Sequence, residues 1–143
     1  MKFVVIATHS ESSLIQEEHK GLPVIVAGVG AINIIKALSH ISKDAEIINY
    51  GYVGSVNLPI GKTYEIGQVS LFHPNVTYNE PQIKLDGNTA CYTNCDFVLR
   101  SDIKDCVYDM ELAYIVAMGF KKVTSYKTVS DNLDYSQYER ATS

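Results

Sequence analysis

The sequence predicts an α/β protein: one domain over residues 1–143, with a mostly parallel or mixed central sheet flanked by helices. A length of 143 residues suits a single compact domain. Strand-like and helix-like segments alternate through the first third of the chain, an order typical of parallel strands with helices on their faces. With 46% hydrophobic and 20% charged residues, the composition is that of a globular protein rather than a disordered or fibrous one.

Three strands are expected in the first third of the chain, at 2–7, 23–27 and 46–50. Each run is apolar and rich in β-branched residues, as buried strands are. Helices are expected between them, at 10–19 and 31–42. In the second of these, four apolar residues recur at helical spacing and define one buried face.

Shorter elements are expected in the rest of the chain. Short apolar runs lie at 68–72 and 82–85, and strands are expected at 106–108 and 122–129. The segment 111–118 is expected to be a helix, because acidic residues stand at its start and Gly119 follows its end. Residues 88–94 show no clear period, and 130–132 are typical of a turn.

Composition excludes several classes of function. The net charge is −4, and the 12 Lys and Arg residues are scattered, so nucleic acid is not expected as a partner. No apolar stretch approaches the roughly 18–20 residues that span a bilayer, and the first residues show no export signal, so a cytoplasmic protein is expected. The three cysteines, Cys91, Cys95 and Cys106, lack zinc-ligand spacing, so free thiols and no metal are expected.

Ligands of such sheets bind where strands end and helices begin. Residues with suitable chemistry follow four expected strands, at 28–30, 51–54, 109–111 and 130–131. The first site lacks the third glycine of a dinucleotide fingerprint, which leaves a tight turn or a loop that contacts substrate. The acids of 109–111 either complement a helix start or accept hydrogen bonds from two sugar hydroxyls. Asp131 either belongs to a turn or is a general acid whose pKa is raised by partial burial.

Seven segments in order resemble the purine nucleoside phosphorylase superfamily, and within it the methylthioadenosine/S-adenosylhomocysteine nucleosidases. They are 1–3, 27–33, 47–54, 66–69, 96–98, 109–113 and 129–131. The resemblance covers nearly the whole chain. It implies a nucleoside phosphorylase-like fold, with segments between the motifs trimmed.

The resemblance also implies roles for individual residues. Asp131 would protonate or hydrogen-bond the purine N7, and Glu111 would hold the ribose hydroxyls. Met110 would pack against the ribose, Phe97 would stack on the purine, and the backbone of Val98 would read the purine edge. The remaining substrate-binding positions that it implies are Gly30, Gly54, Ser130 and Lys127.

Three residues depart from the nucleosidase pattern. Ser12 stands where the family has the acid that activates water, and Glu11, one residue earlier, could replace that acid only with a shifted loop. Tyr52 stands where the family has a serine. Lys127 stands where it has an arginine, which keeps the charge but not the planar fork.

The expected function is therefore that of a purine nucleosidase, which hydrolyses the N-glycosidic bond of an adenosine-type nucleoside without a metal or organic cofactor. A nucleoside-binding homologue with little catalysis remains an alternative, as does a phosphorylase. A phosphorylase needs donors for a phosphate dianion, and the two arginines, Arg100 and Arg140, lie outside the glycine motifs, which favours hydrolysis. The trimmed segments leave apolar surface to cover, so a homodimer is expected. The resemblance to the family's hydrolases implies that a neighbouring copy closes each pocket.

Overall fold

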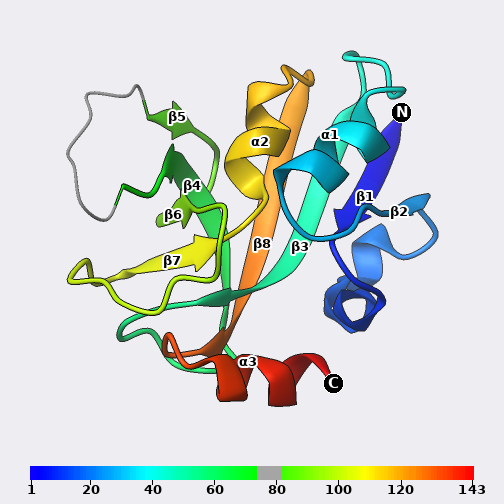
Figure 1. The fold of residues 1–143 in the computed structure, drawn as a ribbon. Helices are drawn as coiled ribbons and strands as arrows, with labels where there is room; N and C mark the ends of the chain where they lie inside the picture. Colours follow the sequence, from blue (N-terminus) through cyan, green and yellow to red (C-terminus); the bar gives the residue numbers. More distant parts are fainter. Residues whose placement is uncertain (74–81) are drawn as a thin grey trace.

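The computed structural model describes residues 1–73 and 82–143 as a mixed sheet with helices against it (Figure 1). Its strands are β1 (Lys2–Ile6), β2 (Val24–Val26), β3 (Glu46–Gly54), β4 (Thr63–Leu71), β5 (Ile83–Lys84), β6 (Thr89–Thr93), β7 (Cys106–Asp109) and β8 (Lys122–Asp131). Its helices are α1 (Ala31–Leu38), α2 (Leu112–Ala117) and α3 (Tyr135–Thr142), with the short 3-10 helices η1 (His9–Leu14) and η2 (Glu17–His19). The predicted α/β fold with a mixed sheet is confirmed.

Five strands curl into a closed ring. The parallel neighbours β3 and β8 continue through β4, which is antiparallel to β8, and then through β6 and β7. A single antiparallel pair, Gly54 with Tyr108, joins β7 back to β3. The parallel strands β1 and β2 extend the sheet outward from β3. Because of this closure, the end of β7 lies beside the ends of β3 and β8.

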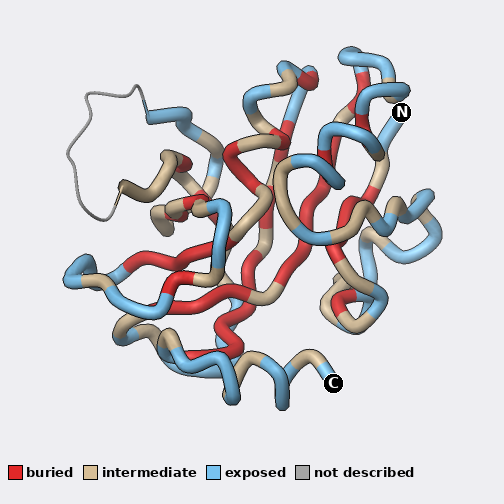
Figure 2. The backbone as a smooth tube through the Cα atoms, in the orientation of Figure 1, coloured by how far each residue is buried: buried red, intermediate tan, exposed pale blue. Residues whose placement is uncertain are grey.

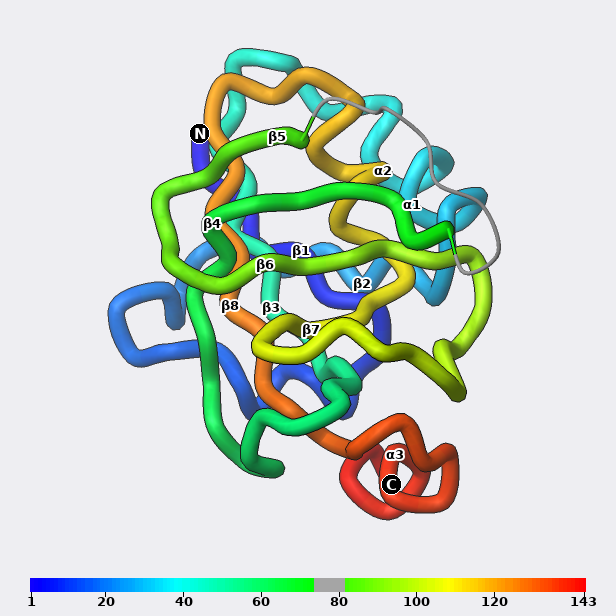
Figure 3. Tube along the Cα trace, turned by 90° about the vertical axis from the view of Figure 1, so that its left-hand side faces the viewer, coloured from blue at the N-terminus to red at the C-terminus, as the bar shows by residue number. Residues whose placement is uncertain are grey.

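The hydrophobic core lies between the strands and the adjacent helices α1 and α2. Ile34 and Leu38, one helical turn apart on α1, are almost fully buried with Leu112 and Ile115 of α2. They pack against strand residues such as Ile47. Burial follows the central strands in Figure 2, whereas α3 lies at one end of the molecule, apart from α1 and α2 (Figure 3). No helix in the described segments is long and apolar enough to cross a membrane.

Two expectations for the first part of the chain are wrong. The segment 10–19 forms η1 and η2 instead of one α-helix, because it wraps around the side chain of Glu11, which bonds the backbone of Ala7 and Thr8. The segment 23–27 contains β2, which is an edge strand rather than a buried one: Val24 is 45% exposed. Its apolar residues predicted the strand correctly but not its place at the border of the sheet.

In the second part, one expectation is corrected, and two elements are present that the sequence did not predict. Residues 89–93, which show no hydrophobic period, form β6. This strand is held by backbone pairing with β4 on one side and β7 on the other, and this pairing does not require a hydrophobic pattern. Ser130 and Asp131 belong to the end of β8 and not to a turn. The last residues form α3, whose first turn is capped by Asp134: its carboxylate accepts hydrogen bonds from the backbone of residues 136 and 137.

The crossing of β4 and the loop before β6 depends on a glycine. A Cβ at Gly67 would lie 2.0 Å from the carbonyl oxygen of Gly87, a backbone atom with no room to move. We expect Gly67→Ala to lower the free energy of unfolding by about 3 kcal/mol or more, measured by urea denaturation. The control is Gly61→Ala, which meets no atom within 4 Å at a positive φ of 93° and should cost about 1 kcal/mol. Equal losses in the two variants would contradict the collision.

Candidate active site

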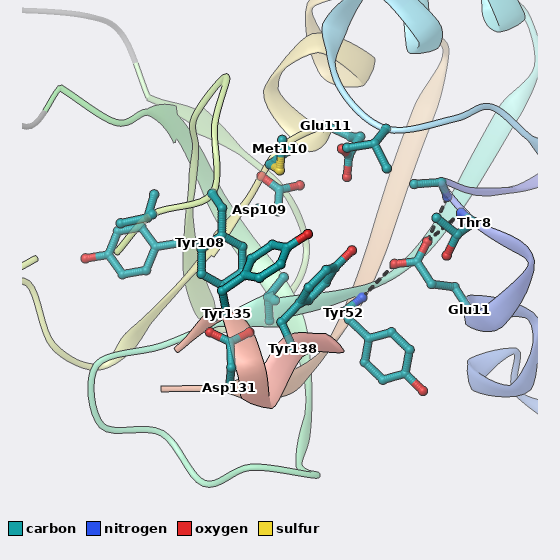
Figure 4. A pocket seen from close by; sticks show the side chains of 16 residues that line it. Thr8, Glu11, Tyr52, Tyr108, Asp109, Met110, Glu111, Asp131, Tyr135 and Tyr138 are labelled. Atoms are coloured by element: carbon teal, nitrogen blue, oxygen red, sulfur yellow. Dashed lines mark hydrogen bonds between the residues drawn. The ribbon is translucent and has the colours of Figure 1, made fainter. Parts of the chain in front are cut away.

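A cavity of about 220 Å³ lies where strands β1, β3, β7 and β8 end. It is lined by Ala7, Thr8, Glu11, Val29, Tyr52, Val53, Gly54, Phe97, Val98, Tyr108, Asp109, Met110, Glu111, Asp131, Tyr135 and Tyr138. Figure 4 shows Asp109 and Glu111 on one side, Glu11 on another, and two tyrosines that rise from α3. The four expected sites at strand ends therefore meet around one space, although β7 runs antiparallel to β3.

Seven of the ten residues proposed for the site from sequence line this cavity: Asp131, Glu111, Glu11, Met110, Phe97, Val98 and Gly54. The other three lie behind its wall. Gly30 donates its backbone N–H to Glu111 Oε2 at 2.9 Å, and the Ser130 hydroxyl donates to Asp131 Oδ2 at 2.7 Å. Lys127 is buried in an ion pair, so the structure does not bring its ammonium to the cavity surface as a substrate-binding group would require.

Asp131 ends β8 beneath the cavity floor. Asp131 is 0% exposed. Its Oδ2 accepts the Ser130 hydroxyl, and its Oδ1 accepts a hydrogen bond from the backbone N–H of Leu133 at 2.9 Å. Burial raises the pKa of this carboxyl above its usual range, and the two hydrogen bonds oppose that rise. A Cβ on Gly54 would lie 2.9 Å from Oδ1, so only glycine leaves room for the carboxylate at this point of β3.

Glu11 reaches the cavity although it stands one residue before the expected position. Its Oε1 accepts hydrogen bonds from the backbone of Ala7 and Thr8 at 2.8 and 3.1 Å, and its Oε2 from Tyr52 at 2.8 Å. Ser12 instead turns outward and donates its hydroxyl to the carbonyl of His9. The tight 3-10 turn of η1 thus brings Glu11, and not Ser12, to the cavity.

Glu111 stands immediately before α2 and faces the cavity. Burial, the Asp109 carboxylate and more weakly the Glu11 carboxylate raise the pKa of Glu111 to about 7, while the Lys127 ammonium and the Gly30 N–H oppose the rise. This carboxyl therefore changes charge near neutral pH. A small change in its surroundings decides whether it is an acceptor or a donor of hydrogen bonds.

Asp109 and Lys127 form a buried ion pair beside Glu111. Lys127 Nζ lies 3.2 Å from Asp109 Oδ2, and each side chain is 1% exposed. Burial by itself lowers the pKa of Lys127, but the carboxylates of Asp109, Glu111 and Glu11 outweigh it and the net shift is upward. Lys127 is thus a cation surrounded by acids, as a buried amine in a carboxylate cluster must be to balance charge.

Three tyrosines change the expected shape of the site. Tyr135 and Tyr138, one helical turn apart on α3, contact the Phe97 ring with centroid distances of 5.2 and 5.4 Å. Sequence reasoning missed both, because it assigned no element after Asp131; the signal was their i, i+3 spacing after the capping residue Asp134. Tyr52 donates its N–H to Glu11, and its ring points away from the carboxylates (Figure 4), so it does not fill the space between them.

The arrangement suits acid–base chemistry on a ligand with hydroxyl groups. Four carboxyl groups, on Glu11, Asp109, Glu111 and Asp131, lie in or beside the cavity with the single ammonium of Lys127. A surplus of buried negative charge stabilises positive charge that develops on a bound molecule. In the described segments, no group of three or more His, Cys, Asp and Glu side chains is arranged to hold a metal ion.

The raised pKa of Glu111 predicts how stability depends on pH. The folded chain binds this proton more tightly than the unfolded chain, so wild-type stability should fall as pH rises from about 4.5 through about 7. Glu111→Gln lacks this titration, so its Tm relative to wild type should grow by roughly 3–6 °C between pH 5 and pH 8. Glu139→Gln, an exposed change on α3, is the matched control. A Tm difference for Glu111→Gln that does not change with pH would contradict the assignment.

Comparison with known proteins gives a structural match without a sequence match. No family model matches the sequence, and no curated protein matches it. The methylthioadenosine/S-adenosylhomocysteine nucleosidase of Neisseria meningitidis, in complex with methylthio-immucillin-A, is similar with a TM-score of 0.77 and 15% identity, over 99% of this chain and 91% of that chain.

Two further nucleosidase structures agree. The Helicobacter pylori enzyme with butyl-thio-DADMe-Immucillin-A has a TM-score of 0.76 and 15% identity, over 99% of this chain and 90% of that chain. The Chlamydia trachomatis enzyme bound to adenine has a TM-score of 0.72 and 17% identity, over 96% of this chain and 85% of that chain. The chain therefore has the fold of the methylthioadenosine/S-adenosylhomocysteine nucleosidases, as the order of its sequence motifs predicted.

Proposed function

We propose that the protein is a nucleosidase that hydrolyses the N-glycosidic bond of an adenosine-type purine nucleoside, such as methylthioadenosine or S-adenosylhomocysteine. The observation that carries this proposal is the meeting of Asp131, Glu111, Glu11 and Phe97 around one cavity, on a fold shared with such enzymes. Four separate segments of the chain supply these side chains, and each has the chemistry that one step of the reaction needs.

The base end of the nucleoside is assigned to Asp131 and Phe97. Burial raises the pKa of the Asp131 carboxyl, the direction that a general acid needs, and we assign this carboxyl to protonate N7 of the purine, which makes the base a better leaving group. Phe97 offers a ring face for the purine, a contact worth about 1–3 kcal/mol where base stacking has been measured. Asp131 is 0% exposed and α3 contacts Phe97 through two tyrosines, so α3 lies beside the place assigned to the base.

The sugar and the water are assigned to Glu111 and Glu11. Glu111, as a carboxylate, accepts hydrogen bonds from the ribose hydroxyls and stabilises the positive charge that develops on the sugar as the bond breaks. Met110 packs beside it in the cavity wall. Glu11 Oε2 has one backbone donor, the Tyr52 N–H, and keeps acceptor capacity to take a proton from the attacking water.

Water is favoured over phosphate as the nucleophile. No lysine or arginine is among the residues that line the cavity, and the nearby ammonium of Lys127 is paired with Asp109. A phosphate dianion would have to enter among four carboxyl groups without a positively charged partner at the cavity surface. The charges therefore support hydrolysis over phosphorolysis.

The direct test is release of free base from a panel of nucleosides: methylthioadenosine, S-adenosylhomocysteine, adenosine and inosine, with and without phosphate. We expect chromatography to detect adenine from at least one adenine nucleoside, at a rate independent of phosphate. Release that requires phosphate and yields a sugar 1-phosphate would instead identify a phosphorylase. Thermal stabilisation by a nucleoside without any release would identify a binding protein, the alternative that Ser12, Tyr52 and Lys127 suggest.

Variants of the two assigned acids test the mechanism. Asp131→Asn and Glu11→Gln should each lower kcat by about 10²–10⁴-fold, because each removes one proton transfer while keeping the side chain's shape. Glu139→Gln, on the exposed side of α3, should leave kcat unchanged. Full activity in Asp131→Asn would show that this residue does not protonate the base.

We also propose that the protein is a homodimer whose interface includes α1. On α1, Ile32 is 75% exposed and Ile35 is 50% exposed, and Val24 on the edge strand β2 adds a further exposed apolar side chain. Val29, just before α1, is also an exposed apolar residue, and it lines the cavity. A second copy against α1 would bury these side chains and reach the rim of the cavity.

Light scattering coupled to size-exclusion chromatography tests this assembly. Wild-type protein should have the mass of two chains, and the double variant Ile32→Asp/Ile35→Asp should have the mass of one chain, because two buried charges without partners oppose association. Leu99→Asp, an exposed apolar residue away from α1, should remain dimeric. A wild-type mass of one chain at micromolar concentration would exclude the dimer.

A further inference from the structure

The ammonium of Lys127 lies where the cavity wall meets the ring of strands. Its Nζ is 3.2 Å from Asp109 Oδ2, and a Cβ on Gly51 would lie 3.1 Å from it. The same Cβ would lie 3.1 Å from Glu11 Oε2, so the ammonium and that carboxylate approach the backbone of β3 at one point. Lys127 therefore links β8 to β7 from inside the protein and does not face the ligand space.

Asp109, the partner of Lys127, holds the first turn of α2. Its Oδ2 accepts the backbone N–H of Leu112 at 2.7 Å, and its Oδ1 accepts the hydroxyl of Thr93 at 2.5 Å. That hydroxyl oxygen in turn accepts the N–H of Ala113 at 3.0 Å. The first N–H groups of a helix have no partner within the helix, so Asp109 and Thr93 satisfy two of them from neighbouring strands.

Glu111 stands between Asp109 and this helical turn. Its backbone is fixed on one side by the end of β7 and on the other by the N–H groups of α2 that Asp109 and Thr93 hold. The carboxyl group is fixed by the Gly30 N–H at 2.9 Å. Any movement of Asp109 therefore displaces the residue to which the proposed function gives the ribose.

We infer that Lys127 is a positioning residue: through its ion pair with Asp109 it anchors the first turn of α2 and so holds the Glu111 carboxylate at the cavity. The inference rests on the proposed function for the role of Glu111. It assigns Lys127 a place behind the wall instead of contact with substrate. The geometry from which we infer this role consists only of contacts within the chain, those that join Lys127, Asp109 and the first turn of α2.

Electrostatics supports the same arrangement and makes it measurable. The charged groups that act on Glu111 are the carboxylates of Asp109 and Glu11 and the ammonium of Lys127. Two tyrosines also interact with Glu111 electrostatically, Tyr138 from α3 and Tyr114 from α2. Removing the ammonium raises the pKa of Glu111, whereas removing the Asp109 carboxylate lowers it. The two halves of one ion pair thus shift the same group in opposite directions.

The test compares Lys127→Met, Lys127→Arg and Asp109→Asn with wild type. In Lys127→Met, kcat/KM at pH 7 should fall by about 10–100-fold. In a plot of kcat/KM against pH, the acidic limb of this variant should move to higher pH. Lys127→Arg keeps the charge and should restore most of this loss, with its acidic limb near that of wild type. Asp109→Asn should move the acidic limb to lower pH. Lys122→Met, an exposed lysine on the same strand, is the matched control and should have the wild-type profile.

A titration that needs no turnover separates this inference from the proposed function. Carbon-13 NMR of the Glu111 carboxyl should show the opposite pKa shifts in the two variants even if no nucleoside is cleaved, in which case only the proposed function fails. A folded Lys127→Met variant with an unchanged profile and titration would overturn the inference. So would a shift in the same direction for both variants, which loss of structure alone would produce.

The neutral pair provides the measurement if Lys127→Met does not fold. Asp109→Asn/Lys127→Met removes both charges at nearly constant volume, so no buried charge is left without a partner. We expect the Glu111 titration to move to lower pH, because Asp109 influences that carboxyl more than Lys127 does, and kcat to fall by about tenfold through the loosened turn. Wild-type kcat with an unmoved Glu111 titration in this variant would overturn the inference.

Discussion

The constraint on which the rest of this structure depends is the burial of four carboxyl groups at one cavity, three of which, on Asp109, Glu111 and Glu11, act on the buried ammonium of Lys127. Carboxylates removed from water require hydrogen-bond donors or a cation, and the chain provides them mostly from its backbone. Glu11 takes three N–H groups, Glu111 takes that of Gly30, and Asp131 takes that of Leu133. Asp109 alone has the cation, Lys127. The turns around the cavity are shaped so that their N–H groups point inward.

The closure of the strand ring brings these groups together. The single pair between Gly54 and Tyr108 joins β3 to β7, and a shift of register after Val53 places Gly54 opposite Asp131 on β8. The absence of a side chain at Gly54 gives the Asp131 carboxylate its space. One residue thus serves both the topology and the chemistry, which explains why β3 ends in a glycine.

Much of the candidate site could be predicted from sequence because it lies at the ends of strands, where local pattern is informative. Asp131 and Glu111 each follow an apolar run of strand length, and the cavity includes both. Glu11 was harder, since its place depends on the 3-10 turn of η1, which forms around the carboxylate itself. Tyr135 and Tyr138 come after a polar stretch of sequence. They contact Phe97 only in the folded chain, because Phe97 is far from them in the sequence.

The sequence by itself determined the α/β class and the central elements β1, β3, β8, α1 and α2, and a family resemblance, not local pattern, named the residues proposed to bind a nucleoside. Periodicity and β-branched runs report on burial within a single element, and that information is local. Only the tertiary structure decided that β2 is an edge strand, that β6 exists without a pattern, and that Lys127 supports Asp109 from behind the wall. Each of these depends on which strand lies alongside, and strand neighbours are chosen by contacts between residues far apart in the chain.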